Sequence, residues 1–563
     1  MPIKLQRKEK LQHEQLNSLT LAVGRIEIKS KVPNKFYQMA NSRFKSTCLL
    51  LAILGLVTCP VWAEPTDEQD NAQHPRLQIS REFVEMAEEL DTRFWHDKAQ
   101  SILTDKLEHH KKLNENRAKN VILFLGDGMS VHTIAATRAF MGDSNKQVFF
   151  EKFPYVGLSK TYAVDERTPD SASTATAYLS GVKGNYGTIG VNAKVQRGDC
   201  HAATDSSTHT ESIAQWAQEA RKWTGLVTTA RVTHASPAGV YAHVADRKWE
   251  HDGKVTKDGC SAELNIDIAR QLVESPVGKN LRVVLGGGRA NFRDKSMADE
   301  EGYAGKRTDG RDLIKDWQED KQQQGADAHY VWSRSGLYNV DLSKTDYLLG
   351  LFDASHCSYH AEREHDEPSL SEMTEAAIDV LSRSENGYFL FVESSGIDGA
   401  HHATKARKAL EETEEFARSI ELARSMTSEE DTLIVVTSDH SHTMTINGYP
   451  YRRQDILSLA PNLATDEVPF TILSYANGPG FVNTYDDGGR MDLTNVDTTD
   501  PNFQFQATVP LASEAHGGED VGVFASGPHE HFFSGNYEQT TIPALMAYAA
   551  NIGPFAKNEL RKS

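Results

Sequence analysis

The segment Pro169–Tyr178 contains Ser171, which follows Asp170 and opens a run of small residues that favour a helix. At the N-terminus of such a helix, free backbone N–H groups and the helix dipole attract an anion. Ser171 is therefore a candidate nucleophile toward a phosphate-like group. On this segment alone the alternative stays open that Asp170 or Ser171 only caps a buried, alanine-rich helix.

Potential metal ligands are spread along the chain and fall into three groups by type. Two imidazoles and one carboxylate are the ligand mix of a zinc site with an open position. A second group is richer in carboxylates, and a third offers only oxygen, which suits magnesium. The first group is Asp398, His402 and His516, the second is Asp127, Asp439 and His440, and the third is Ser236 and Glu393 with Asp127 shared.

Two metal ions that bridge one phosphate are arranged for an in-line displacement, because one activates the nucleophile and the other stabilises the leaving oxygen. Arg247 could hold the two non-bridging phosphoryl oxygens, since a guanidinium group matches them bidentately. Ordinary interpretations exist as well. Arg247 lies in a charged stretch typical of a solvated face, and Ser236 and His516 are each compatible with a simple turn.

Apolar runs predict the strands that would position these side chains. Strands that alternate with helices indicate an α/β fold with a mainly parallel sheet, covered by helices on both faces. Ligands bind such sheets at the carboxyl ends of the strands, and four of the five runs lead into Asp, Glu, His or Ser. The expected strands are 121–125, 226–229, 283–285, 388–392 and 433–437, and helices are expected at 210–221, 371–382 and 406–426.

The chain has 563 residues and a net charge of −19. Nucleic-acid binding through a broad basic face is therefore not expected, and an anionic substrate would need metal ions or a buried arginine. Residues 443–511 are rich in Gly, Asn, Asp and Pro, which indicates an inserted subdomain. A strand at 521–525 and a helix near 542–550 would complete the domain, and helical periodicity at 81–112 indicates an amphipathic arm before it.

The N-terminal residues are typical of an export signal. Residues 48–56 are strongly apolar and lead to a small-residue pattern that ends at Ala63, so a signal peptide over 1–63 is expected. The apolar run is too short to favour a membrane span. Met39 would be a more typical start, and lipid attachment at Cys59 is an alternative. We expect an N-terminal segment and arm at 64–117 and a catalytic domain at 118–563.

Three cysteines follow the expected signal peptide: Cys200, Cys260 and Cys357. An oxidising compartment would allow one disulfide and one free thiol. The residues themselves do not choose the pair.

Six motifs, in this order, resemble those of alkaline phosphatases, especially of the animal-type branch. The resemblance extends from about residue 80 to residue 555, which is nearly the whole mature chain. The motifs are long, so the resemblance is specific. They are Phe124-Leu-Gly-Asp-Gly-Met129, Pro169-Asp-Ser-Ala-Ser-Thr-Ala-Thr-Ala-Tyr178, Val182-Lys-Gly-Asn-Tyr-Gly187, Arg231-Val-Thr-His-Ala-Ser-Pro237, Thr437-Ser-Asp-His-Ser-His442 and His516-Gly-Gly-Glu-Asp-Val521.

The resemblance implies a role for each matching residue. Ser171 would be the nucleophile that becomes a phosphoserine, and Arg247 would bind the phosphate. His442 would orient a ligand carboxylate, and His234 would lie near the magnesium. The implied first zinc site is Asp398, His402 and His516, the second is Asp127, Asp439 and His440 with Ser171 joining it, and the magnesium site is Asp127, Ser236 and Glu393.

Further features are implied by the same resemblance. Cys200 and Cys260 match a disulfide of the animal enzymes, which would leave Cys357 free. The insert 443–511 resembles their crown subdomain at the dimer interface, so a homodimer is expected. No apolar tail follows the domain, so a lipid anchor is not expected. We expect a periplasmic or secreted enzyme that acts on small phosphate monoesters. A peripheral calcium-type site would comprise Glu301, the Phe352 carbonyl, Asp353 and Glu367.

One motif departs from the animal pattern Glu-Gly-Gly-Arg-Ile-Asp-His-Gly-His-His. The chain reads Glu393-Ser-Ser-Gly-Ile-Asp-Gly-Ala-His-His402, which keeps the ligands but loses a basic residue and a histidine. Three alternative functions fit the sequence less well. A phosphodiesterase of the same superfamily would lack Arg247 or use threonine, and a sulfatase would need Cys/Ser-x-Pro-x-Arg. A catalytically silent metal-binding or phosphate-binding protein would lack the nucleophile or a ligand.

Overall fold

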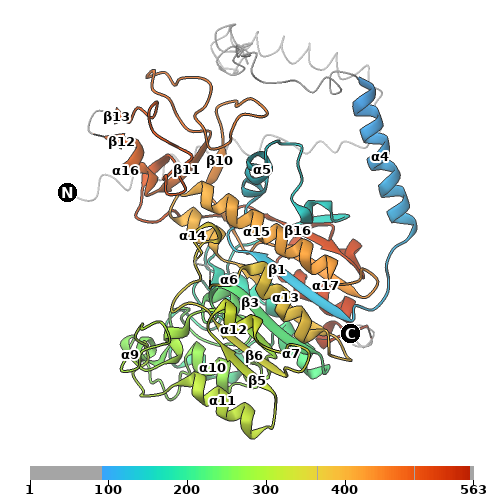
Figure 1. Ribbon diagram of the computed structural model, residues 1–563, viewed down its shortest axis with the longest axis vertical. Helices are drawn as coiled ribbons and strands as arrows, with labels where there is room; N and C mark the ends of the chain where they lie inside the picture. The colour runs from blue at the N-terminus through green and yellow to red at the C-terminus, as the bar shows by residue number, and fades with distance from the viewer. Residues whose placement is uncertain (1–91, 364–365, 487–488, 558–563) are drawn as a thin grey trace, which may run out of the picture. The chain divides into compact units, whose positions relative to one another are not determined.

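The computed structural model describes residues 92–557, except 364–365 and 487–488 (Figure 1). The expected signal peptide, the alternative start at Met39, Cys59 and the expected helical residues 81–91 lie outside the described residues. Within the described ranges, no helix combines the length and the apolar character that a membrane crossing requires. The one described helix of the expected arm is α4 (Thr92–Lys111), and none of its residues is buried.

A ten-stranded sheet forms the centre of the described chain (Figure 1). The mainly parallel α/β fold expected from the sequence is confirmed. Each of the five expected apolar runs lies inside an observed strand. Only β16 runs antiparallel to its neighbours in this sheet. In spatial order the strands are β17 (Gly535–Glu538), β2 (Tyr155–Lys160), β16 (Val521–Ser526), β8 (Thr432–Thr437), β1 (Asn120–Gly126), β7 (Tyr388–Ser394), β3 (Trp223–Arg231), β4 (Val283–Gly287), β6 (Tyr347–Leu351) and β5 (Ala328–Val331).

The central strand β1 shows how both faces of the sheet are buried. Val121, Leu123 and Leu125 point into one hydrophobic core, and Ile122 and Phe124 point into the other, because side chains alternate along a strand. The first core is closed by α6 (Ser171–Ser180), α7 (Ile213–Glu219), α8 (Ala235–Ala238), α9 (Asp252–Lys257), α10 (Ile268–Glu274), α11 (Leu313–Gln323) and α17 (Thr541–Ala550). The second is closed by α5 (Val131–Phe140), α12 (Arg334–Tyr338), α13 (Leu370–Leu381), α14 (Gly396–His402) and α15 (Ala406–Ser425).

Strands β8, β1, β7 and β3 are direct neighbours and run parallel, so their carboxyl ends meet at one edge. The register places Leu125 at the end of β1 opposite Glu393 on β7. The chain continues from β1 into Asp127 and from β8 into Asp439, while Ser236 follows β3 on the short helix α8. The fold therefore gathers candidate ligands that lie more than 300 residues apart in sequence.

Residues between β8 and β16 form smaller sheets with a third hydrophobic core. Strand β11 (Leu473–Gly478) lies between β10 (Met444–Ile446) and β14 (Ala507–Pro510) in the three-stranded sheet of this insert. The pair β9 (Ser441–His442) and β15 (His516–Gly517) brings two candidate site histidines opposite each other. The remaining elements are α16 (Gly480–Thr484), β12 (Tyr485–Asp486) and β13 (Gly489–Arg490).

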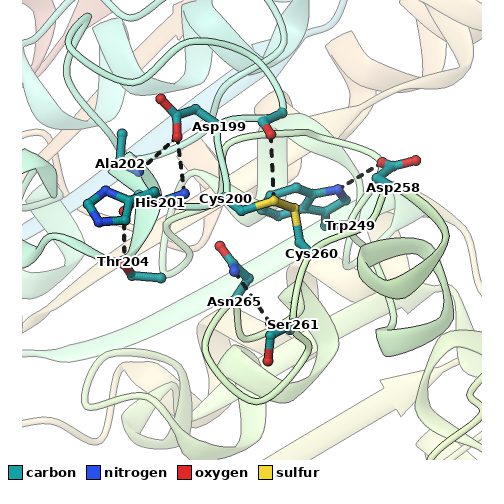
Figure 2. The surroundings of a disulfide bond; sticks show 11 residues. Asp199, Cys200, His201, Ala202, Thr204, Trp249, Asp258, Cys260, Ser261 and Asn265 are labelled. Atoms are coloured by element: carbon teal, nitrogen blue, oxygen red, sulfur yellow. Dashed lines mark hydrogen bonds between the residues drawn. A yellow bond between two sulfur atoms is a disulfide. The ribbon is translucent and has the colours of Figure 1, made fainter.

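Cys200 and Cys260 form a disulfide, shown in Figure 2, and Cys357 is free. The bond closes a loop with a sequence separation of 60 residues. In the chain-entropy model a loop of this length contributes about 4 kcal/mol to the free energy of unfolding. We expect the double variant Cys200→Ala/Cys260→Ala to melt at a lower temperature than the wild type. A reductant should lower the melting temperature of the wild type alone; an equal effect on the double variant would contradict this.

Candidate active site

Ser171 is the first residue of α6, and its side chain is buried. The preceding Asp170 has extended backbone and accepts a hydrogen bond from Ser173 N at 3.1 Å, so Asp170 caps the helix. The cap is therefore Asp170, and Ser171 is left at the helix N-terminus. The Ser171 hydroxyl lies 3.2 Å from His440 Nε2.

Asp170 also connects the nucleophile helix to Arg247. Arg247 Nη1 donates to Asp170 Oδ2 at 2.9 Å, and Gly187 N donates to Asp170 Oδ1 at 3.0 Å. Burial favours the neutral acid, but Arg247 and these hydrogen bonds hold the pKa of Asp170 below its ordinary value. Arg247 is thus fixed against a buried carboxylate, and the solvated face that its charged sequence neighbours suggested is not what the structure shows.

The first ligand group comes together as the sequence predicted. Asp398 and His402 share α14, and His516 arrives from β15. His402 Nε2 lies 3.1 Å from His516 Nε2, and each of these nitrogens lies 3.4 Å from Asp398 Oδ1. The Nδ1 atoms of His402 and His516 lie 2.5 and 2.8 Å from the carbonyls of Glu514 and Pro169. These bonds fix the tautomer and leave both Nε2 lone pairs for a metal.

His442 lies beside this group but makes different contacts. Its Nδ1 lies 2.5 Å from Glu514 Oε2, and its Nε2 lies 2.8 Å from Asp398 Oδ1. Burial disfavours its charged form, but Glu514 and Asp398 outweigh this and raise the pKa of His442 to about 10. His442 Nε2 therefore contacts the same Asp398 oxygen as His402 and His516, and the four residues lie close enough together for one metal ion.

Glu514 holds His442 in position on the side away from Asp398. The sequence pattern did not identify Glu514 as a site residue. Its buried carboxylate accepts from Thr443 N at 2.7 Å and holds His442. We expect Glu514→Gln to weaken divalent-metal binding at the Asp398 group by about 10- to 100-fold, because His442 loses its counter-charge. Chelator competition would measure this. Glu519→Gln, which changes the same charge in the same segment, should bind metal normally; equal loss in both variants would contradict the role of Glu514.

The second group surrounds His440. His440 Nε2 lies 3.2 Å from Asp439 Oδ2, 3.4 Å from Asp127 Oδ1 and 3.2 Å from the Ser171 hydroxyl. Burial, reinforced by neighbouring imidazoles, holds the pKa of His440 well below its ordinary value, so the ring is neutral. Gly128 leaves room for the neighbouring ring of His442. It has φ +71°, and a Cβ there would lie 2.5 Å from that ring.

The third group contains buried polar atoms without hydrogen-bond partners. Both carboxylate oxygens of Asp127, the Ser236 hydroxyl, Glu393 Oε1 and His234 Nδ1 are all of this kind. The other Glu393 oxygen accepts from Thr228 Oγ1 at 2.5 Å. Buried acceptors are normally paired, and a cluster of unpaired ones fits a cation. Asp127, His234 and Glu393 form one of three groups in the described chain with ligand atoms close enough for one metal ion.

The buried carboxylates give the site an excess of negative charge that favours bound cations. Burial, with Asp439, Asp398 and Glu393 nearby, raises the pKa of Asp127 well above its ordinary value. Burial likewise raises the pKa of Glu393 to about 8, and nearby Asp439 adds to this. These carboxylates cannot all be ionised together without positive charge between them. The residues present therefore fit bound metal ions.

The carboxylates of the predicted peripheral site have other partners in the structure. The Glu301 carboxylate pairs with Arg289, and Asp353 Oδ1 accepts from Ser355 N at 2.6 Å. Glu367 accepts from Ser358 N at 2.8 Å. In the parts of the chain that the structure describes, these carboxylates do not form a group close enough for one ion. A fourth metal held by Glu301, Phe352, Asp353 and Glu367 stays a prediction.

Comparison with known proteins identifies relatives of this chain. The family model for alkaline phosphatase matches residues 118–552. The chain is 47% identical over 482 residues to the membrane-bound alkaline phosphatase of Bombyx mori, covering 83% of this chain and 87% of that protein. It is 44% identical over 478 residues to the tissue-nonspecific alkaline phosphatase isozyme of Homo sapiens, covering 83% and 90%.

Solved structures share the fold. The alkaline phosphatase of Thermus thermophilus superposes with a TM-score of 0.55 at 22% identity, over 80% of this chain and 97% of that one. The cold-active enzyme of a psychrophilic Shewanella species gives a TM-score of 0.53 at 24% identity, over 77% and 99%.

Proposed function

The chain belongs to the alkaline phosphatase family and is a metal-dependent phosphomonoesterase, and from this premise we propose that it acts through a phosphoserine on Ser171. The observation that carries the proposal is the position of Ser171 at a helix N-terminus, 3.2 Å from His440 and beside two metal-capable groups. Alternatives that lack a nucleophile or a phosphate-binding arginine do not account for this arrangement.

We assign two zinc ions and one magnesium ion to the three groups. Ligands of a tetrahedral zinc at about 2.0–2.2 Å lie about 3.4 Å from one another, and the separations of Asp398, His402 and His516 are 3.1, 3.4 and 3.4 Å. The second zinc would be held by Asp127, Asp439 and His440. The oxygen-rich set of Asp127, Ser236 and Glu393 suits magnesium. Metal analysis of the purified protein tests this assignment.

In the proposed reaction the Ser171 oxygen attacks phosphorus, and the bond from phosphorus to the alcohol oxygen breaks. Water then attacks the phosphoserine and releases inorganic phosphate, which restores the Ser171 hydroxyl. The metals supply a lowered pKa for bound hydroxyl groups and water and neutralise phosphoryl charge. Arg247 binds two phosphoryl oxygens. Asp170 accepts a hydrogen bond from Arg247 and caps α6, which fixes the position of Arg247 relative to Ser171.

Arg247→Lys is expected to lower kcat/KM for a phosphate monoester by about tenfold or more. Lysine keeps the charge but cannot make the paired hydrogen bonds of a guanidinium group. Steady-state kinetics with a chromogenic monoester measures the effect. Arg197→Lys is the matched control, because Arg197 pairs with the neighbouring Asp246 at 2.9 Å. The role of Arg247 fails if the two variants lose the same amount of activity.

The class of reaction is tested with three chromogenic substrates of one leaving group at alkaline pH. We expect the phosphate monoester to be hydrolysed far faster than the phosphate diester or the sulfate monoester. In a diester the second ester group removes one of the oxygens that could pair with Arg247. A sulfate monoester keeps its free oxygens but carries one negative charge, whereas a phosphate monoester carries two at alkaline pH and is attracted more strongly by Arg247 and the metals. Faster turnover of the diester would overturn the assignment to monoesters.

We also propose an exported homodimer in which residues 443–511 form a crown-like subdomain at the interface. The disulfide supports an oxidising compartment, such as the periplasm or the outside of the cell. The third hydrophobic core, in which residues 444–507 pack against α5 and α15, supports an inserted unit. Light scattering of the purified protein should give twice the chain mass, and deletion of 443–511 should give a monomer or fail to fold.

A further inference from the structure

A cavity of about 890 Å³ lies between α7 and α10, on the side of the sheet that also carries α6. None of the catalytic or metal-binding candidates lines it. Its volume falls in the range of small-molecule sites, which is about 300–1,000 Å³. Its walls come from the loop 203–211, α7, the loop 241–249 and the segments 264–266 and 271–280.

The cavity has an apolar wall and unsatisfied polar atoms. Leu264, Ile266 and Pro276 line it with exposed or half-buried side chains, and Tyr241, Val244 and Trp249 are buried behind the surface. Thr210 Oγ1 and Asn265 Oδ1 also line it, are buried and have no hydrogen-bond partner. Unpaired buried polar atoms in a protein normally indicate a missing partner such as a ligand or water. The Asn265 oxygen can only accept, so its partner must donate a hydrogen bond.

The charge at the cavity is negative. Glu211, Glu219 and Glu274 line it, and no described lysine or arginine does. Glu274 is paired with Arg270 and Arg311, while Glu211 and Glu219 accept only neutral donors, from Trp216 and Gln215. Burial holds the pKa of His243, another lining residue, at about 4, so its ring stays neutral at pH 7.5. An anion such as a phosphoester is therefore disfavoured here.

The disulfide fastens two walls of this cavity together. Cys200 precedes the lining residues that begin at Ala203, and Cys260 precedes those that begin at Leu264. Figure 2 shows Trp249 and Asn265 close to this bond. The Trp249 indole donates to Asp258 Oδ2 at 2.9 Å, which fixes the ring. Two such constraints indicate that the cavity is largely pre-formed, which lowers the entropic cost of binding.

We propose that this cavity is a second binding site, separate from the phosphatase centre, for a small organic amine with an apolar body. The apolar body would lie against Leu264, Ile266 and Pro276, which are lining apolar residues that keep accessible surface. The ammonium group would donate to Asn265 and be attracted by the carboxylates of Glu211 and Glu219. The reaction at Ser171 plays no part in this binding.

Calorimetric titration with phenethylamine, in an amine-free buffer at pH 7.5, tests the site. Phenylacetate and phenethyl alcohol are matched probes with the same ring. We expect the amine to bind at least about tenfold more tightly than phenylacetate, with the alcohol between them. Absence of amine binding below about 10 mM, or preference for the anion, overturns the proposal.

Variants locate the bound amine. Glu211→Gln/Glu219→Gln should weaken binding about fivefold, because exposed ion pairs contribute modestly. Asn265→Leu should weaken it at least about threefold through the lost hydrogen bond. Glu263→Gln changes the same charge at an exposed residue outside the lining and should stay within twofold of the wild type. Equal weakening in all three variants would contradict the location.

The phosphatase centre is excluded by two further titrations. Ser171→Ala should bind phenethylamine as the wild type does, and saturating inorganic phosphate should not displace the amine. Displacement by phosphate, or loss of binding in Ser171→Ala, would place the amine in the active site and refute the second site. The proposed phosphatase mechanism would be unaffected by that result.

Discussion

Ser171→Ala is expected to lower kcat for a phosphate monoester by at least about a thousandfold, because it removes the only protein atom proposed to form a bond with phosphorus. Alanine is a good helix former, and Asp170 still caps α6, so the fold should persist. Metal content and melting temperature should therefore stay close to those of the wild type. Those two readouts separate loss of the nucleophile from loss of the structure.

The matched control for this variant is Ser180→Ala. Ser180 is the last residue of the same helix, is also buried, and its hydroxyl has no hydrogen-bond partner. Its replacement should leave kcat within about twofold of the wild type. A Ser171→Ala enzyme with full activity, or a Ser180→Ala enzyme as impaired as Ser171→Ala, would contradict the assignment of the nucleophile.

Removal of the metals is expected to abolish activity and to lower the melting temperature by more than about 5 °C, since ions bound to the folded state stabilise it. Asp127, Glu393 and Asp439 are fully buried side by side, and without cations they repel one another. Addition of zinc and magnesium should restore both properties. The melting temperature of Ser171→Ala should fall to the same extent on chelation, because its ligands are nearly complete.

The stability of the metal-free protein should also depend on pH. The folded-state pKa of Glu393 is about 8, above its ordinary value, and that of Asp127 is raised as well. At these carboxyls the folded state binds more protons than the unfolded state up to about pH 8, so their contribution to stability falls as the pH rises toward that value. Buried histidines such as His243, whose pKa burial lowers to about 4, act in the opposite direction only below about pH 6.5. Thermal melts of chelated protein at pH 7 and pH 9 should therefore show a lower midpoint at pH 9. A midpoint that rises with pH would contradict this cause.

Much of the site could be predicted from the sequence because each ligand follows a clear local signal. Asp127 and Asp439 follow apolar strands, and Asp398 and His402 are one helical turn apart. Strand order is different. The adjacency of β8, β1, β7 and β3 is set by the packing of helices on both faces, and no local pattern encodes it.

The elements that sequence patterns missed have a common physical cause. Strand β2 lies near the edge of the sheet, and it exposes the apolar Val156 and Leu158 while it buries Gly157 and Ser159, so its hydropathy does not follow its burial. Glu514 lies in the loop between β14 and β15, and its contact with His442 depends on the pairing of β15 with β9. The burial of Arg247 against Asp170 was hidden by its charged sequence neighbours. In each case a tertiary contact decides the outcome.

The most direct test of the mechanism is to trap the phosphorylated enzyme and to map the phosphate. The wild-type protein is mixed with a monoester that carries labelled phosphate, quenched in acid within milliseconds to seconds, digested and analysed by mass spectrometry. We expect the label on the Ser171 peptide, at Ser171 itself, and no label in Ser171→Ala. Label at another residue, or turnover with no phosphorylated residue under any quench condition, would contradict catalysis through a phosphoserine at this position.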